Sequence, residues 1–107
     1  MSNAPEALSP EDAKLVTLAR ATRARTRAAE GAAVRDLDGR TYAAATVALE
    51  ALQVSAVGVA VSMAISSGSR GLEAVVLLTD GSLSEGDRAA VMEFGGPGVP
   101  ILVNPGA

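Results

Sequence analysis

The sequence predicts an α/β domain in which helices cover a partly parallel, mixed sheet of about four strands. Helical and strand-like segments follow one another in the order α-β-β-α-β-α-β. A short turn joins the first two strands, so they are expected to be antiparallel, whereas helical crossovers between the later strands favour parallel pairing. The length of 107 residues suits a single domain, predicted for residues 10–107, with one modest core.

The first helix is predicted for residues 10–29. Ser9 is a suitable N-cap, Pro10 fits the first turn, and the two acidic residues that follow suit the positive end of the helix dipole. Gly31 is expected to end this helix. The polar, proline-containing residues 1–9 are predicted to form a flexible tail.

Two short strands are predicted at residues 32–35 and 40–45. The sequence Asp-Leu-Asp-Gly between them is a hairpin signal, because its glycine supplies the positive φ that such turns need. Residues 72–79, LEAVVLLT, form a continuous apolar run with β-branched members, which predicts a central strand buried on both faces. The ILV at 101–103 predicts a last short strand.

Residues 47–65 are ambiguous, because apolar and small residues alternate there as in a strand. A single strand of that length would span roughly 60 Å, whereas a helix would span about 28 Å. A membrane span is the other alternative, but Glu50, Gln53 and many small residues lie within the run. The sequence therefore predicts a buried helix rich in small residues. A further helix is expected from Ser84, with Asp87 completing an acidic capping box, to about Phe94.

The composition excludes several kinds of chemistry. The 107 residues contain neither Cys nor His, which removes the usual zinc ligands, the commonest general base and the thiol nucleophile. A net charge of -3 and only two aromatic residues argue against a nucleic-acid binder. No charged segment precedes an apolar run at the N-terminus, so no signal peptide is expected and the predicted location is cytoplasmic. No cofactor is predicted.

Three segments, in order along the chain, resemble bacterial cytidine deaminases. Residues 30–47 resemble the opening hairpin of that family, with its Gly-Ala-Ala strand and Asp-Gly turn. Residues 65–68 match the end of its second helix, and residues 87–103 match its third helix, Gly/Pro loop and last strand. The resemblance implies a three-layer α/β/α fold, a zinc-dependent active site and a homo-oligomer.

The positions that carry the family's metal chemistry hold other residues here. The resemblance places Ser55, Ser84 and Asp87 where the family has its three zinc ligands, and Val57 where it has the Glu that moves protons. Asp80, Ser84 and Asp87 could offer oxygen ligands to a hard cation, but such residues at a helix start are more often caps. The sequence therefore predicts no metal and no deaminase activity.

The substrate contacts are replaced as well. The ribose-binding Asn-x-Glu of the family matches Thr46 and Ala48, and the Phe that stacks on the pyrimidine falls near Ala28. The predicted remnant of the pocket therefore comprises Thr46, Ala48, Ser55, Val57, Ser84 and Asp87.

Two helical stripes have both a structural and a functional interpretation. Arg20, Arg23 and Arg27 could bind phosphate, RNA or an acidic partner, but a solvated helix face is favoured because no aromatic residue or glycine-rich loop accompanies them. A ridge of small residues at Ala56, Ala60 and Ala64 is expected to pack on the chain's own sheet. The alternative, a contact between subunits, gains weight from the oligomeric habit of the resembled family.

Three functions remain open. The first is a non-catalytic structural or regulatory scaffold, expected as a dimer or tetramer and open to an unknown protein partner. The second is a nucleoside- or nucleotide-binding module with a degenerate pocket. The third is an enzyme of altered, zinc-independent chemistry with Asp87 or Asp80 as base, although the residues favour a protein that is not an enzyme.

Overall fold

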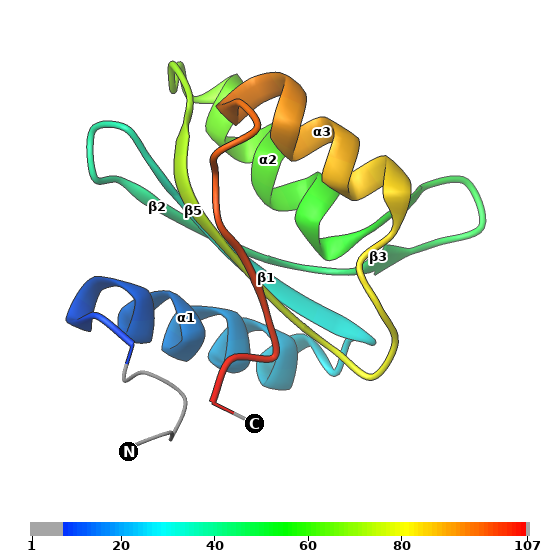
Figure 1. Cartoon of the computed structure of the whole chain (residues 1–107). Helices are drawn as coiled ribbons and strands as arrows, with labels where there is room; N and C mark the ends of the chain where they lie inside the picture. Colours follow the sequence, from blue (N-terminus) through cyan, green and yellow to red (C-terminus); the bar gives the residue numbers. More distant parts are fainter. Residues whose placement is uncertain (1–7, 107) are drawn as a thin grey trace.

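The computed structural model describes residues 8–106 and contains one mixed sheet of four strands between two helical layers. The strands of this sheet run in the order β2-β1-β5-β6, with β1 antiparallel to both of its neighbours and β5 parallel to β6. One helix, α1, covers one face, and α2 and α3 cover the other (Figure 1). The three-layer α/β/α prediction is confirmed. The elements are α1 (Pro10–Thr26), β1 (Glu30–Asp36), β2 (Thr41–Ala45), β3 (Val47–Ala48), β4 (Gln53–Val54), α2 (Ala56–Ser66), β5 (Leu72–Thr79), α3 (Glu85–Gly95) and β6 (Ile101–Val103).

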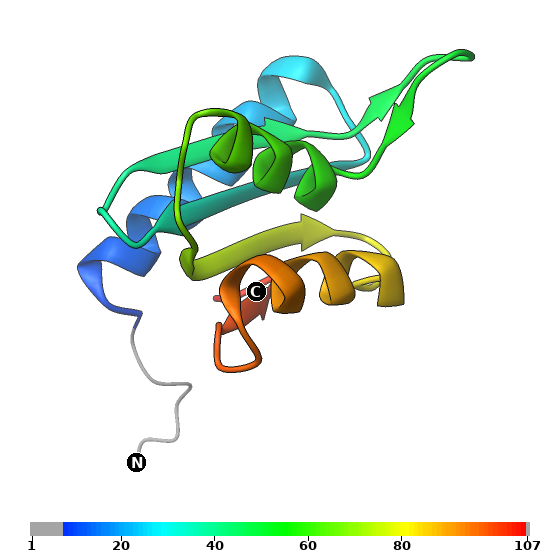
Figure 2. The ribbon, with the colours of Figure 1, turned by 90° about the horizontal axis from the view of Figure 1, so that it is seen from above.

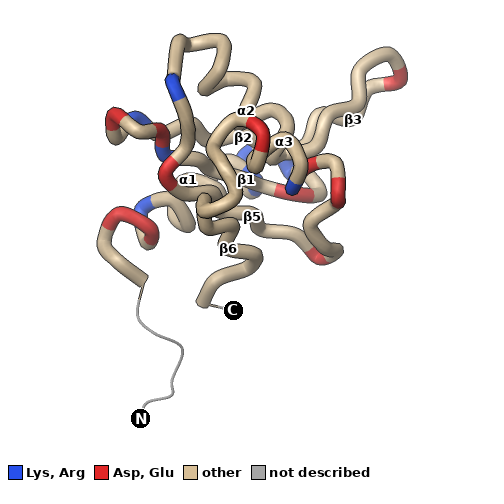
Figure 3. Tube along the Cα trace, turned by 45° about the horizontal axis from the view of Figure 1, so that its top comes forward, with Lys and Arg blue, Asp and Glu red and all other residues tan. Residues whose placement is uncertain are grey.

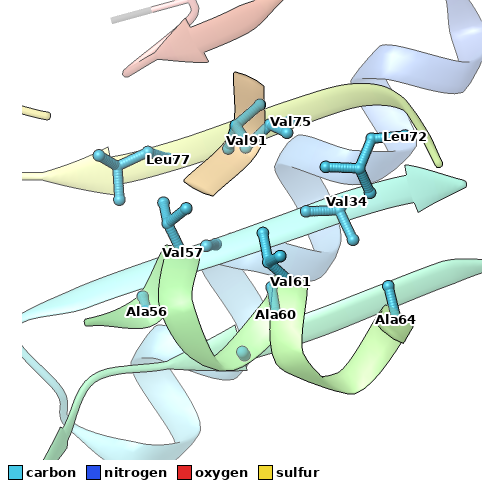
Figure 4. Packing of buried hydrophobic residues seen from close by; sticks show 12 residues of the cluster. Val34, Ala56, Val57, Ala60, Val61, Ala64, Leu72, Val75, Leu77 and Val91 are labelled. Carbon is cyan, nitrogen blue, oxygen red and sulfur yellow. The ribbon is translucent and has the colours of Figure 1, made fainter. Parts of the chain in front are cut away.

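The central strand β5 separates two apolar clusters, because successive side chains of a strand point to opposite faces. Val75 and Leu77 face α2 and α3, whereas Val76 and Leu78 face α1. On the α2 side the ridge of Ala56, Ala60 and Ala64 is fully buried against the sheet. Figure 4 shows these alanines in the same apolar cluster as Val34 and Leu72 of the strands. The small alanines let α2 lie close to the strands, so the packing interpretation of this ridge is confirmed.

The prediction of one helix over residues 47–65 is wrong in its first half. Val47–Ala48 and Gln53–Val54 pair as a separate antiparallel hairpin, β3 and β4, and α2 begins only at Ala56. The helix starts there because Ser55 caps it, with its Oγ accepting a hydrogen bond from the Gly58 N–H at 3.0 Å. The hairpin projects from the body of the molecule (Figure 2).

The end of α1 also differs from the prediction. The helix stops at Thr26, and Arg27 takes the left-handed conformation (φ 55°) that ends it, whereas Gly31 lies within β1. Gly31 serves a different need, since a Cβ there would lie 2.7 Å from the Cβ of Arg23. The glycine lets helix and strand approach closely. Of the predicted tail, residues 1–7 lie outside the described residues, while Leu8 packs against the cluster under α1.

A membrane span is the alternative interpretation of the apolar run at residues 47–65. Among residues 8–106 no helix combines the length and the apolar character that crossing a bilayer requires.

Candidate functional site

The start of α2 and the start of α3 meet at a hydrogen-bonded pair of side chains. Ser55 Oγ donates to Asp87 Oδ1 at 2.7 Å while it caps α2. Ser84 caps α3 in turn, with its Oγ accepting from the Asp87 N–H at 3.1 Å. The carboxylate of Asp87 therefore lies where the N-terminal ends of α2 and α3 meet. We call Ser55, Ser84 and Asp87 the helix-start cluster.

Val57 is next to this cluster in sequence but takes no part in it. Its side chain is fully buried and packs toward the sheet together with Val61 (Figure 4). A carboxylate at this position would be buried among apolar side chains at a cost of several kcal/mol. Val57, which the resemblance matches to the family's proton-moving Glu, is thus a core residue in this protein.

The remaining two residues of the predicted pocket remnant are held elsewhere. Thr46 Oγ1 accepts from the Glu30 N–H at 2.9 Å, and so ties the end of β2 to the start of β1. Ala48 is exposed in β3, where it pairs with Gln53. The structure thus brings together Ser55, Ser84 and Asp87 out of the six predicted positions.

Asp80, the other candidate base or oxygen ligand, points away from the helix-start cluster. Its carboxylate lies 3.5 Å from the Arg23 guanidinium of α1, and its side chain is 99% exposed. Among residues 8–106, no three acidic side chains gather in a way that could hold a metal ion. The oxygen donors of the helix-start cluster are thus one carboxylate and two hydroxyls, of which Ser55 Oγ already bonds the Asp87 carboxylate and Ser84 Oγ already bonds the Asp87 N–H.

The predicted arginine stripe divides in the structure. Arg20 and Arg23 line a hollow of about 210 Å³ on the α1 side of the sheet, whereas Arg27 is exposed at the end of the helix. Only Arg20 and Arg23 of the predicted stripe therefore line this hollow.

Sequence reasoning missed a buried polar network at the β1–β2 turn. Asp36 is fully buried, and its carboxylate accepts hydrogen bonds from the N–H groups of Asp38 and Arg40, each at 2.9 Å, and from Ser69 Oγ at 2.5 Å. The Tyr42 hydroxyl lies 3.3 Å from Ser69 Oγ. The hydrogen bond from Ser69 has the largest effect on the pKa of Asp36 and lowers it. The two N–H bonds lower this pKa further, while burial acts in the opposite direction. Aspartate at the first position of a turn is the signal that could have pointed to this bonding.

A second missed feature is an apolar hollow of about 480 Å³ between the β3–β4 hairpin and the outer side of α2. Its apolar lining comes from Val47, Leu52, Val54, Val59 and Met63. Leu52 is 53% exposed and Met63 39% exposed, so large apolar side chains face solvent there. We call this surface the hairpin groove. It could not be predicted while residues 47–55 were interpreted as helix.

The family model for cytidine deaminase-like proteins matches residues 8–107. The chain belongs to the cytidine deaminase-like family. No curated protein sequence matches the chain.

Solved structures of cytidine deaminases share the fold. The enzyme from Mycobacterium leprae is similar with a TM-score of 0.76 and 22% identity, over 89% of this chain and 89% of that chain. The enzyme from Burkholderia pseudomallei gives 0.76 and 21%, over 92% of this chain and 88% of that chain. The enzyme from Mycobacterium tuberculosis gives 0.74 and 22%, over 90% and 85%. These matches confirm the predicted fold, and the family model confirms the predicted family. Identities this low carry no conclusion about activity.

Proposed function

We propose that this member of the cytidine deaminase-like family is a non-catalytic protein that acts as a homo-oligomeric structural or regulatory scaffold. The observation that carries the loss of catalysis is the hydrogen bond between Ser55 and Asp87. By the family resemblance these side chains stand at two zinc-ligand positions, and here they bond each other. Tight zinc sites need imidazole or thiolate ligands, and the sequence contains neither.

The acid–base part of the reaction lacks its group as well. Deamination in this family uses a metal-activated water and a Glu that shuttles protons. The resemblance matches Val57 to that Glu, and the Val57 side chain is aliphatic and buried in the core, so it cannot carry a proton. We infer that this chain has neither the ligands for a metal that would activate the water nor a residue that would carry the proton.

The hairpin groove supports the oligomeric part of the proposal. A lone two-stranded hairpin is marginally stable in water. In this hairpin Leu49 is 62% exposed, and Leu52 lines the groove together with residues of α2. Its single charged residue, Glu50, lies at the tip between β3 and β4 (Figure 3). A second copy seated against the groove would remove these side chains from water. We therefore propose a dimer or tetramer that contacts through the hairpin and the outer side of α2.

Light scattering coupled to gel filtration tests the assembly. We expect a dimer or tetramer at micromolar concentration, and we expect Met63→Glu to shift it toward monomer while the melting transition stays cooperative. Met92→Glu is the matched control, because Met92 is similarly exposed on α3 and lies outside the groove. A wild-type chain that is monomeric under these conditions would contradict the proposal.

A thermal-shift measurement distinguishes the nucleoside-binding alternative from the scaffold. A thermal-shift panel of nucleosides and nucleotides should leave the melting temperature of a scaffold unchanged. A saturable rise with any nucleoside, lost on Asp87→Ala, would favour the degenerate-pocket function instead.

A further inference from the structure

A second hollow lies on the opposite face of the sheet from the helix-start cluster, beside the ends of the parallel strands β5 and β6. It has a volume of about 210 Å³ and is lined by Arg20, Arg23, Leu78, Asn104, Pro105 and Gly106. Leu78 is near the carboxyl end of β5, and Asn104 directly follows β6. Open α/β sheets bind ligands most often at the carboxyl ends of their strands. The position is thus one that suits a ligand.

The hollow carries positive charge that its own walls do not neutralise. Arg20 and Arg23 are three residues apart, so they lie on the same side of α1. Among residues 8–106 no acidic residue lines the hollow. Within residues 8–106 Arg20 makes no ion pair. Arg23 pairs at 3.5 Å with Asp80, whose side chain is 99% exposed, and an ion pair so open to water contributes little. Two guanidinium groups are therefore available to an anion.

The arginine side of the hollow is held in place by close packing. Gly31 of β1 leaves no room for a Cβ, which would lie 2.7 Å from the Cβ of Arg23. The stem of Arg23 is thus fixed against the strand, and only 27% of its side chain is exposed. With its first side-chain carbon packed and its side chain mostly buried, Arg23 loses less freedom when it binds an anion than a fully exposed arginine does.

The opposite wall is also fixed, by an unusual backbone turn. Asn104 has a φ of 48°, which is uncommon for a residue other than glycine. Its Oδ1 accepts from the Thr79 N–H at 2.8 Å, and its Nδ2 donates to the Thr79 carbonyl at 2.9 Å. Its own N–H donates to the Leu77 carbonyl at 2.8 Å. Three hydrogen bonds to β5 therefore hold this wall in a conformation that costs free energy, as is often seen beside binding sites.

We propose that this hollow binds a phosphate or pyrophosphate group, either free or attached to a small organic molecule. Guanidinium groups bind tetrahedral oxyanions through paired, charge-assisted hydrogen bonds, and two arginines line this hollow. The apolar surfaces of Leu78 and Pro105 beside them give room for an organic substituent. This site is separate from the helix-start cluster and from the hairpin groove, and it needs no metal.

Calorimetric titration tests the site, with inorganic phosphate, pyrophosphate, a nucleoside monophosphate and the matching nucleoside as probes. We expect saturable binding of the phosphorylated probes and none of the nucleoside. The double variant Arg20→Gln/Arg23→Gln should weaken binding by about tenfold or more, since it removes two charge-assisted contacts. Arg25→Gln/Arg27→Gln is the matched control, because it removes the same charge from exposed positions of the same segment that do not line the hollow.

The two double variants distinguish binding in the hollow from diffuse electrostatic attraction. Equal weakening by both double variants would mean diffuse attraction and would overturn the proposal, as would the absence of saturable binding to any phosphorylated probe. The single variant Arg20→Gln, at an exposed position, keeps the test valid if the double variant melts early. Tighter binding of the monophosphate than of inorganic phosphate would assign the site to an organic phosphate, and similar binding would assign it to the free anion.

Discussion

Single buried side chains connect parts of the fold that are far apart in the sequence. Asp36 is the clearest case: a fully buried carboxylate that receives hydrogen bonds from the Asp38 and Arg40 N–H groups and from Ser69 Oγ. It joins the β1–β2 turn to the loop between α2 and β5, so a group that would be costly when unpaired becomes a tie between distant parts of the chain.

The lowered pKa of Asp36 gives a pH prediction. The folded-state pKa lies below the unfolded value of about 3.9, so the ionised carboxylate stabilises the fold above that pH. This contribution is lost as the pH falls through the lower, folded-state value. Urea unfolding at neutral and strongly acidic pH should therefore show a steeper loss of stability for the wild type than for Asp36→Asn. Equal losses in the two proteins would show that the Asp36 charge does not stabilise the fold.

Elements show which features the sequence can predict and which it cannot. The β1–β2 hairpin was predicted because its turn signal is local, and β5 because a strand buried on both faces is uniformly apolar. Residues 47–55 were misinterpreted because the hairpin turn at Glu50 and Ala51 has no Gly, Asn or Pro to mark it. The resemblance grouped Ser55, Ser84 and Asp87, but the hydrogen bond between Ser55 and Asp87 could not be predicted, because it joins residues 32 positions apart.

Gly31 was misassigned for a similar reason, because a glycine needed for close packing looks the same in a sequence as one that ends a helix. Gly31→Ala should destabilise the protein by about 1–3 kcal/mol, since its Cβ would overlap the backbone of Ala19 and the stem of Arg23. Gly86→Ala is the matched control: the position is helical and nothing lies within 4 Å of the added Cβ. That substitution should stabilise α3 by about 0.5–1 kcal/mol. Chemical denaturation measures both, and a neutral Gly31→Ala would contradict the close contact.

At the scale of the whole molecule, the core and the proposed interface occupy different sides of α2. Ala60 is fully buried against the chain's own sheet, whereas Met63 is exposed at the hairpin groove. The apolar run of residues 54–65 thus serves two surfaces, which explains why it lacks a polar face.

This separation predicts two different phenotypes on one helix. Ala60→Glu should abolish cooperative folding, because it buries an unpaired carboxylate at a cost of several kcal/mol. Met63→Glu should instead leave the melting transition intact. Circular dichroism during heating distinguishes the two, and a stable, cooperatively folded Ala60→Glu protein would show that the ridge is not part of the core.

The central claim, that this chain keeps the fold of the cytidine deaminase-like family without its chemistry, is tested most directly by a deamination assay. Purified protein is incubated with cytidine and deoxycytidine, in parallel with Asp87→Ala, and the formation of uridine products is measured. We expect both proteins to give the same background rate, because the metal-activated water and the proton-moving Glu have no counterparts in the helix-start cluster or at Val57. Turnover that follows the wild-type chain through gel filtration and is abolished by Asp87→Ala would contradict the account and assign catalysis to that carboxylate.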